Sequence, residues 1–395
     1  MLSEHVPGVR SVSVGVWVRH GSAHEPAARM GESHMLEHMV FKGTERRSAH
    51  DIALSLEALG GSLDAFTSRE HTAFQARVLD SHLPEALDVL ADMVRRPLLR
   101  DDDLGLEREV VLEEIAQVDD TPDDLVFELH GEGLWQGHAY GHAILGTRET
   151  VGALTGDDLR ALHDTRYRGR NLVVAATGNV DHDRFLALVS EAFGDLDAGE
   201  APTPAADPAG TRSGRRWVDR ESHQLHLVVG REGVSHAHPL RIPLILVSQA
   251  FGGGMSSRLF QRIREELGLA YTVFSYQSFY SRSGLVGVYL GTRPGSGERA
   301  EEALREEFAR ISRDSLGADE LEQTRMQVKG QIMLSLESTS ARLYRLAGSA
   351  LNGEPWLGLD DLLARVDAVT PDQVAEAARL AFDPDSQYTL LLGPG

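Results

Sequence analysis

The sequence contains no cysteine among its 395 residues. This absence excludes disulfides, thiolate metal sites and cysteine nucleophiles, so any metal must be bound by histidine and carboxylate side chains. Basic residues are also outnumbered, because 39 Lys and Arg stand against 60 Asp and Glu and give a formal net charge of −21. A nucleic-acid-binding surface needs a basic footprint, so we expect no nucleic-acid partner.

Long apolar runs are missing as well. No run approaches the roughly 18 residues that a membrane-spanning helix requires, so we expect no membrane partner. The first ten residues carry Glu4, His5 and Pro7 where a signal peptide would have its apolar segment, so a cytoplasmic location is expected. With 42% apolar and 25% charged residues, the composition is that of an ordinary folded protein.

The length of 395 residues predicts two domains, because a single core rarely grows beyond about 250–300 residues. Residues 198–215 lose apolar periodicity and are rich in Pro, Gly and Ala, which is typical of a linker. We therefore predict an N-terminal domain over residues 1–197 and a C-terminal domain over residues 216–395.

The two sides of this linker resemble each other. Short patterns match at offsets of 210, 217 and 215 residues, and the matched pairs include Phe41 with Phe251, Arg108 with Arg325, and Leu154 with Val369. Offsets that drift by so few residues indicate a duplicated unit with small loop insertions. Chance matching of short apolar patterns is the alternative.

Apolar periodicity predicts several elements. Residues 12–18 alternate valine with Ser, Gly and Trp, which predicts a half-buried strand. Ser48 can act as the N-cap of a helix, and further helices are predicted over residues 84–96 and 102–118.

The segment from Ser33 to His38 reads Ser-His-Met-Leu-Glu-His. We expect a helix here, with Ser33 as its N-cap and Gly43 beyond its end. On a helix, His34 and His38 are four residues apart and project from one face, where they can share one tetrahedral ion. Glu37 borders the same face and is placed to act on a water instead of binding the metal. An isolated His pair would more often be a solvated helix face, but the Glu favours a metal site.

A catalytic zinc needs a third protein ligand and an open fourth position. The predicted helix over residues 102–118 offers four Glu. At about 100° per residue, Glu107 and Glu114 lie beside the apolar stripe of this helix, whereas Glu109 and Glu113 face away from it. Placing two carboxylates beside a core is unfavourable without a cation, so a metal explains their position.

His-x-x-Glu-His, followed 76 residues later by Glu114 within Glu-Arg-Glu-Val-Val-Leu-Glu-Glu-Ile, resembles the pitrilysin/insulinase family of zinc peptidases, the inverzincins. The chain is most similar to the short two-repeat type, which includes mitochondrial processing peptidase and its bacterial relatives. The resemblance implies that His34, His38 and Glu114 bind one Zn²⁺ per chain and that Glu37 is the general base. It also implies that Glu107 supports the site without being a primary ligand.

The second half lacks the metal-site residues at the matched positions. At these offsets the residues are Leu244, Val247, Ser248 and Gln331, in place of His34, Glu37, His38 and Glu114. We therefore expect the C-terminal domain to bind no metal.

Arg264 and Tyr271 lie at a predicted junction between a helix, capped by Ser256 or Ser257, and a strand. Periodicity alone favours a surface arginine and a strand tyrosine. The resemblance implies instead that they are the substrate-binding pair of the family, which could donate hydrogen bonds to the scissile carbonyl as it becomes an oxyanion.

Residues 61–74 resemble the edge strand on which the family pairs an extended peptide by main-chain hydrogen bonds. This resemblance implies substrate contacts from Ala65, Phe66 and Thr67. The family more often has Asn at the position of Asp64 and Tyr at that of Phe74.

The expected fold is therefore α+β, with two duplicated domains that each pack a β-sheet against helices and together form half of a clam-shell chamber. The resemblance implies a zinc-dependent endopeptidase that hydrolyses peptides or unfolded segments by attack of a metal-activated water, with the C-terminal domain binding substrate. A homodimer is expected, because this chain carries both the metal motif and the Arg/Tyr pair. The alternative is a noncatalytic homologue that acts as a structural or partner subunit, although such homologues typically lose part of the metal motif.

Overall fold

Two five-stranded β-sheets organise residues 1–394, the part of the chain that this computed structural model describes. Contacts divide the chain into two compact units. Unit 1 comprises Met1–Ala116, His142–Ala205 and Leu334–Trp356, and unit 2 comprises Gln117–Gly141, Ala206–Met333 and the segment from Leu357 onward. Each unit therefore contains one segment from the other half of the sequence.

The sheet of unit 1 has the strand order β1-β5-β2-β4-β3. Its strands are β1 (Leu2–His5), β2 (Ser11–Val18), β3 (Ser62–Thr67), β4 (Thr72–Leu79) and β5 (Leu172–Gly178). Strand β1 pairs parallel to β5, and the other neighbours are antiparallel. Among the described residues β3 pairs only with β4, so it is an edge strand, as the resemblance implied.

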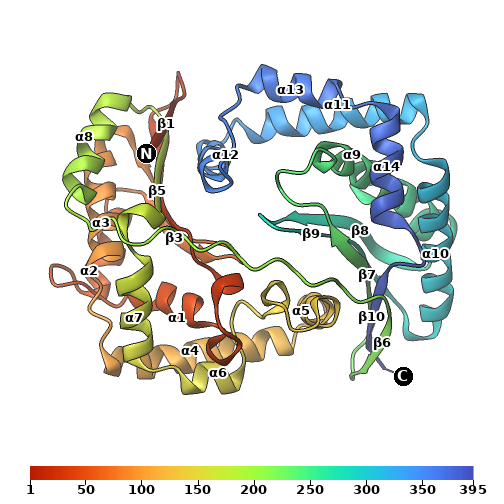
Figure 1. Ribbon diagram of the computed structural model, residues 1–395, viewed down its shortest axis with the longest axis horizontal. Helices are drawn as coiled ribbons and strands as arrows, with labels where there is room; N and C mark the ends of the chain where they lie inside the picture. The colour runs from red at the N-terminus through yellow and green to blue at the C-terminus, as the bar shows by residue number, and fades with distance from the viewer. Residues whose placement is uncertain (395) are drawn as a thin grey trace. The chain divides into compact units, whose positions relative to one another are not determined.

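Helices cover one face of this sheet and enclose its main core (Figure 1). Those against its strands are α1 (Glu32–Val40), α2 (Ala49–Glu57), α3 (Leu83–Arg95) and α8 (His182–Phe193). Helices α4 (Asp101–Asp119), α6 (Arg148–Ala153) and α7 (Gly156–Arg166) add side chains to the same core, and the last three residues of α4 belong to unit 2. The helices predicted after Ser48, over 84–96 and over 102–118 are confirmed as α2, α3 and α4. As predicted, the Ser48 hydroxyl caps α2 by accepting a hydrogen bond from the Asp51 N–H.

Strand β2 is buried on both faces, so the prediction of a half-buried strand is wrong. Helix α12 (Thr339–Leu351) covers the second face. Trp17 packs there against Leu343, and the Ser13 hydroxyl lies 2.9 Å from that of Thr339. Because this helix lies more than 320 residues further along the sequence, periodicity around β2 could not reveal it.

The sheet of unit 2 has the strand order β6-β10-β7-β9-β8. Its strands are β6 (Gly214–Asp219), β7 (Leu225–Gly233), β8 (Ala270–Phe279), β9 (Gly284–Thr292) and β10 (Tyr388–Gly393). The helices of this unit are α5 (Pro122–Trp135), α9 (Arg241–Gly252), a π-helix (Phe260–Glu266), α10 (Gly297–Asp314), α11 (Ala318–Ser335), α13 (Leu359–Asp367) and α14 (Pro371–Phe382). The last two residues of α11 belong to unit 1.

The predicted duplication is confirmed, because the two sheets have the same strand order when each unit is numbered along the chain. A detailed contact also repeats. The Arg108 guanidinium donates to the Leu154 carbonyl at 2.8 Å, and the matched Arg325 donates to the carbonyl of Val369 at 2.5 Å. Helices α5 and α12 are matched as well. Helix α5 comes from the first half of the sequence and packs on the sheet of unit 2, whereas α12 comes from the second half and packs on the sheet of unit 1.

The remaining segments are short or irregular. Short 3₁₀ helices cover Ser22–His24, Ala27–Arg29, Asp80–His82, Ala139–Gly141, Gly169–Asn171 and Pro294–Ser296. Residues 198–213 of the predicted linker contain no helix or strand, and the predicted domain boundaries stay a prediction. In the part of the chain described, we find no helix with the length and apolarity needed to cross a bilayer.

Candidate metal centre

Helix α1 begins at Glu32, and its N-cap is Gly31 in the left-handed conformation with φ 89°. The prediction of Ser33 as N-cap is therefore wrong. The backbone N–H groups of Gly31 and Ser33 each donate to the carboxylate of Glu25 at 2.8 Å. A carboxylate at this end satisfies free N–H groups and stabilises the positive end of the helix dipole. Glu25 thus does from outside the helix what a serine cap would do.

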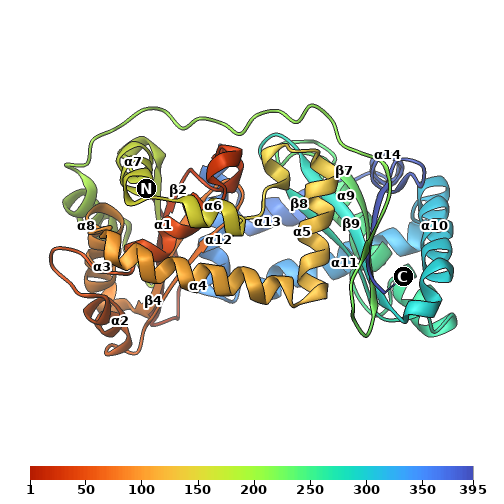
Figure 2. The same cartoon turned by 90° about the horizontal axis from the view of Figure 1, so that it is seen from below.

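His34 and His38 on α1 come together with Glu114 on α4 (both helices are labelled in Figure 2). The Nε2 atoms of His34 and His38 each lie 3.7 Å from a carboxylate oxygen of Glu114. One possible ligand atom from each of the three residues lies within 4.8 Å of the others. Across residues 1–394 we find no second group of three such side chains.

Glu107 orients one of these histidines. Its Oε2 lies 3.0 Å from Nδ1 of His38, and its other oxygen forms an ion pair with Lys42. A histidine that donates its Nδ1–H to a carboxylate keeps its Nε2 lone pair free for a metal. Glu107 is buried, whereas Glu109 and Glu113 are exposed, so the predicted orientation of these three side chains on α4 is confirmed.

The ionisation of His34 suits a metal ligand. Burial, assisted by the nearby His38, lowers the pKa of His34 to about 3, so its ring is neutral at pH 7. Metal binding requires a neutral imidazole. The His34 Nδ1 atom is buried without a hydrogen-bond partner among the described residues. Two imidazoles and one carboxylate, with a carboxylate behind His38, fit the donor set of a catalytic zinc with one open position.

Glu37 lies on the same helix, and only 8% of the residue is exposed. Burial raises the pKa of its carboxyl group, and a hydrogen bond from Thr67 opposes this rise. The Thr67 hydroxyl donates to Glu37 Oε2 at 2.6 Å. Glu37 is thus a buried carboxylate within one helical turn of His34 and His38, and it is not one of the three candidate metal ligands.

The three edge-strand residues with predicted substrate contacts occupy β3, but their side chains differ in surroundings. Thr67 reaches Glu37, and Ala65 packs against the core. The Phe66 ring lies 5.8 Å from that of His71 and 5.9 Å from that of Tyr344. Sequence reasoning missed the contact between Thr67 and Glu37, because residues 30 apart show no spacing that predicts it.

Unit 2 contains the predicted substrate-binding pair. The helix predicted after Ser256 or Ser257 contains a π-helix over Phe260–Glu266, and Arg264 lies within it. The Arg264 guanidinium carbon lies 4.5 Å from the ring centroid of Phe260 and 4.4 Å from that of Tyr271. Tyr271 is 76% exposed. Arg264 and Tyr271 are therefore stacked on each other, and π-helical segments are frequent at functional sites.

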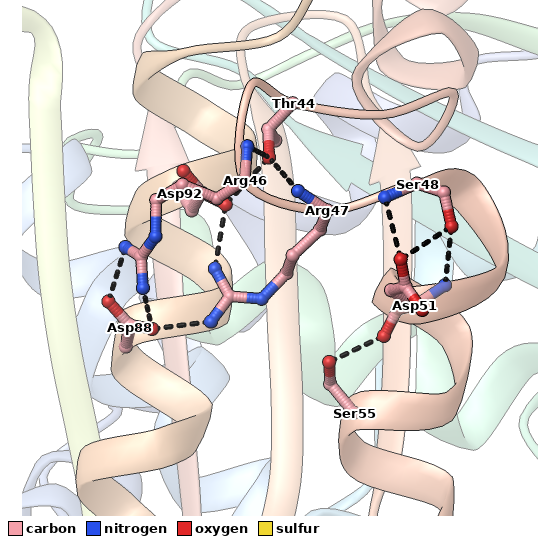
Figure 3. A network of polar contacts seen from close by, with 8 residues as sticks. All are labelled: Thr44, Arg46, Arg47, Ser48, Asp51, Ser55, Asp88 and Asp92. Carbon is pink, nitrogen blue, oxygen red and sulfur yellow. Dashed lines mark hydrogen bonds and ion pairs between the residues drawn. The ribbon is translucent and has the colours of Figure 1, made fainter.

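The loop after α1 is fixed to α3 by a polar network (Figure 3). Arg46 and Arg47 both form ion pairs with Asp88. Arg47 also pairs with Asp92 at 2.6 Å, and the hydroxyl of Thr44 donates to the same Asp92 oxygen at 2.7 Å. The side chain of Asp92 is fully buried, and charge-assisted bonds to it are strong. This network anchors the chain immediately beyond the C-terminal end of the helix that carries the two histidines.

Family comparisons match both halves of the chain. The model for insulinase (peptidase family M16) matches residues 1–148, and the model for the peptidase M16 inactive domain matches residues 153–328. The chain is 40% identical over 388 residues to an uncharacterized zinc protease of Streptomyces coelicolor, covering 96% of this chain and 84% of the relative. It is 39% identical over 392 residues to the uncharacterized zinc protease YmxG of Bacillus subtilis, covering 99% and 95% of the two chains.

Solved structures share the fold. A peptidase M16 inactive domain from Pseudomonas fluorescens aligns with a TM-score of 0.93 at 21% identity, over 100% of this chain and 95% of that chain. A protease from Helicobacter pylori aligns with a TM-score of 0.91 at 21% identity, over 99% and 96%. Both likenesses support the mixed α+β architecture with two similar halves.

Proposed function

Because the chain belongs to the insulinase (M16) family of peptidases, we propose that it is a zinc-dependent endopeptidase acting on peptides or unfolded segments. The names of the curated relatives support zinc and proteolysis as a class. The observation that carries the proposal is the group of His34, His38 and Glu114, with the buried carboxylate of Glu37 beside it. A noncatalytic subunit would not need a base at this position.

His34, His38 and Glu114 would hold the zinc ion. When bound, zinc lowers the pKa of a water toward about 7 and polarises the carbonyl of the substrate. Glu37 accepts the proton of the attacking water and passes it to the leaving amine, which is general base and then general acid catalysis by one carboxylate. Glu107 keeps His38 in the tautomer that binds metal through Nε2.

The proposal also assigns several residues of this chain to substrate binding. An extended peptide adds to the free edge of β3 by main-chain hydrogen bonds near Ala65 and Phe66. Arg264 and Tyr271 donate hydrogen bonds to the carbonyl oxygen as negative charge develops on it. Since one chain carries all these groups, a homodimer would not require an inactive partner chain.

Zinc analysis combined with a quenched fluorescent peptide library tests the proposal. We expect about one zinc per purified chain, cleavage of library peptides, loss of cleavage after chelation and recovery on adding zinc. Size-exclusion chromatography of the same sample tests the homodimer. A chain that binds zinc but cleaves no peptide would support the noncatalytic homologue instead.

A further inference from the structure

Thr67 joins two features that act in the proposed peptidase, the edge strand β3 and the base Glu37. We propose that Thr67 is a positioning residue, whose hydroxyl holds one carboxylate oxygen of Glu37 so that the other oxygen is presented to the reacting water. This inference rests on the proposed function. It assigns the Thr67 side chain to orienting the base, whereas the resemblance implied only contact with substrate.

The direction of the hydrogen bond follows from the neighbouring groups. The Thr67 Oγ1 lies 2.6 Å from Glu37 Oε2 and 3.4 Å from Oγ1 of Thr72. The Thr72 hydroxyl donates its own proton to the carbonyl of His20 at 3.1 Å. An ionised carboxylate can only accept, and the Thr72 oxygen at 3.4 Å is the more distant acceptor, so the Thr67 hydroxyl donates to Glu37. A bond from a hydroxyl to a carboxylate is short and strong.

The strand end that carries Thr67 is held in place by its surroundings. The turn after it closes with a hydrogen bond from the Ser68 N–H to the carbonyl of His71, and the Ser68 carbonyl accepts from the Ser22 N–H at 3.2 Å. This approach requires Gly21, because a Cβ there would lie 2.3 Å from the Ser68 carbonyl oxygen. A hydroxyl on a fixed main chain can restrict the Glu37 side chain to one rotamer, which lowers the entropy lost at the reaction step.

The second half shows what this position does when no base is present. At the offset of 210, Gln277 on β8 corresponds to Thr67, and Val247 on α9 corresponds to Glu37. The helix and the edge strand are still joined there, because the Ser248 hydroxyl donates to Gln277 Oε1 at 2.6 Å. Both groups of that bond are neutral. A helix-to-edge-strand hydrogen bond thus occurs in both units, but only in unit 1 does it reach an ionisable group.

The location of Thr67 also links the base to substrate pairing. A peptide that adds to β3 would extend the sheet and restrain the strand whose last residue contacts Glu37. The orientation of the base would then be best defined when substrate is bound. We therefore expect loss of the hydroxyl to act on turnover and not on substrate affinity.

Three variants test the inference in the zinc-loaded full chain. Thr67→Val removes the hydroxyl with little change of shape and should lower kcat at least about tenfold, a part of the roughly hundredfold or more that a general base supplies. Its KM and its zinc affinity should stay within about threefold of wild type. Thr67→Ser keeps the hydroxyl and should retain kcat within about threefold. Thr72→Val, which removes the neighbouring buried hydroxyl, is the matched control and should also retain kcat.

Several outcomes would overturn the inference. An unchanged kcat in Thr67→Val would show that the hydrogen bond does not position the base. Equal losses in Thr67→Val and Thr67→Ser would assign the effect to packing, and a fall in zinc affinity would assign it to the metal ligands. Absence of cleavage by the wild-type chain would refute the proposed peptidase itself, which separates the two failures.

Discussion

Helices α1 and α9 occupy matched positions in the two units, whose sheets have the same strand order. The two helices differ in the polarity of their buried side chains. In α9, Leu244 and Val247 are buried in the apolar core of unit 2. In α1 the matched residues are His34 and Glu37, which are almost as buried. Since an apolar helix serves the fold in unit 2, the polar residues of α1 are not needed to build such a unit. Their burial opposes folding, which is typical of residues retained for function.

Helices α4 and α11 show the same difference between the two units. Glu107 is buried in α4, and the matched residue of α11 is Thr324, whose hydroxyl donates to the Glu320 carbonyl within its own helix. The threonine needs no partner outside the helix. The buried carboxylate requires two, and it finds them in His38 and Lys42. The first unit thus differs from the second by a connected set of substitutions and not by single residues.

The largest expected effect removes the proposed base from this set. Glu37→Gln keeps the size of the side chain and should lower peptide cleavage by about 10²–10⁴-fold, the usual contribution of a general base. Zinc content should be unchanged, because Glu37 is not among the three grouped ligands. Cleavage rate and zinc stoichiometry are measured together, with the exposed Glu113→Gln on α4 as control. Full activity of Glu37→Gln would refute the proposed role.

The second prediction introduces into α9 of unit 2 the carboxylate that unit 1 has at Glu37. Val247→Glu places a carboxylate in a fully buried position. At the matched positions around it, Leu244, Ser248 and Gln277 replace His34, His38 and Thr67. We expect the free energy of unfolding to fall by about 3–5 kcal/mol, the usual effect of an uncompensated buried charge. The reverse change, Glu37→Val, should alter it by less than about 1 kcal/mol in zinc-free protein. Urea unfolding of both variants measures the difference, and equal losses would mean that the two positions are not equivalent.

The local part of the candidate metal centre could be predicted from the sequence. The spacing of His34 and His38 is set by one helix turn, and the angular position of Glu107 and Glu114 follows from the apolar stripe of their own helix. Such patterns depend only on helix geometry. The apolar residues Leu244 and Val247 of the second half could be predicted from the repeat offsets, which do not depend on helix geometry.

The remaining contacts are tertiary, and their partners lie outside any local pattern. Glu25 caps α1 from a preceding loop, and Thr67 reaches Glu37 from an edge strand. The burial of Trp17 depends on a helix from the second half of the sequence. The π-helix around Arg264 also escaped prediction, because apolar spacing does not distinguish i+4 from i+5 hydrogen bonding over so short a segment.

A third prediction concerns acid stability in unit 2, where His130 is buried and its Nε2 lies 3.0 Å from the carbonyl of Tyr388. Burial lowers the pKa of His130 to about 4 from the ordinary 6.5. Between these values the unfolded chain takes up a proton that the folded chain does not. The stability contribution is therefore complete above pH 6.5 and is lost as the pH falls toward 4, by up to roughly 3 kcal/mol.

His130→Gln, which can still donate to the Tyr388 carbonyl, should flatten this dependence. Urea unfolding at pH 7, 6, 5 and 4 measures it, and His50→Gln at an exposed position of α2 is the control. The same steep loss of stability in His130→Gln would place the acid-sensitive group elsewhere.

The smallest expected effect on stability lies at the stacked pair of unit 2. Tyr271 is largely exposed, and Arg264 keeps a second ring, that of Phe260, when Tyr271 is altered. Tyr271→Leu should therefore lower the free energy of unfolding by no more than about 0.5–1 kcal/mol, the range for exposed cation–π contacts. Tyr271→Phe retains the stack and should not change it, so any fall in its peptide turnover reports the hydroxyl alone. A large loss of stability in either variant would mean that Tyr271 has a structural role in unit 2 and would count against the proposed role in substrate binding.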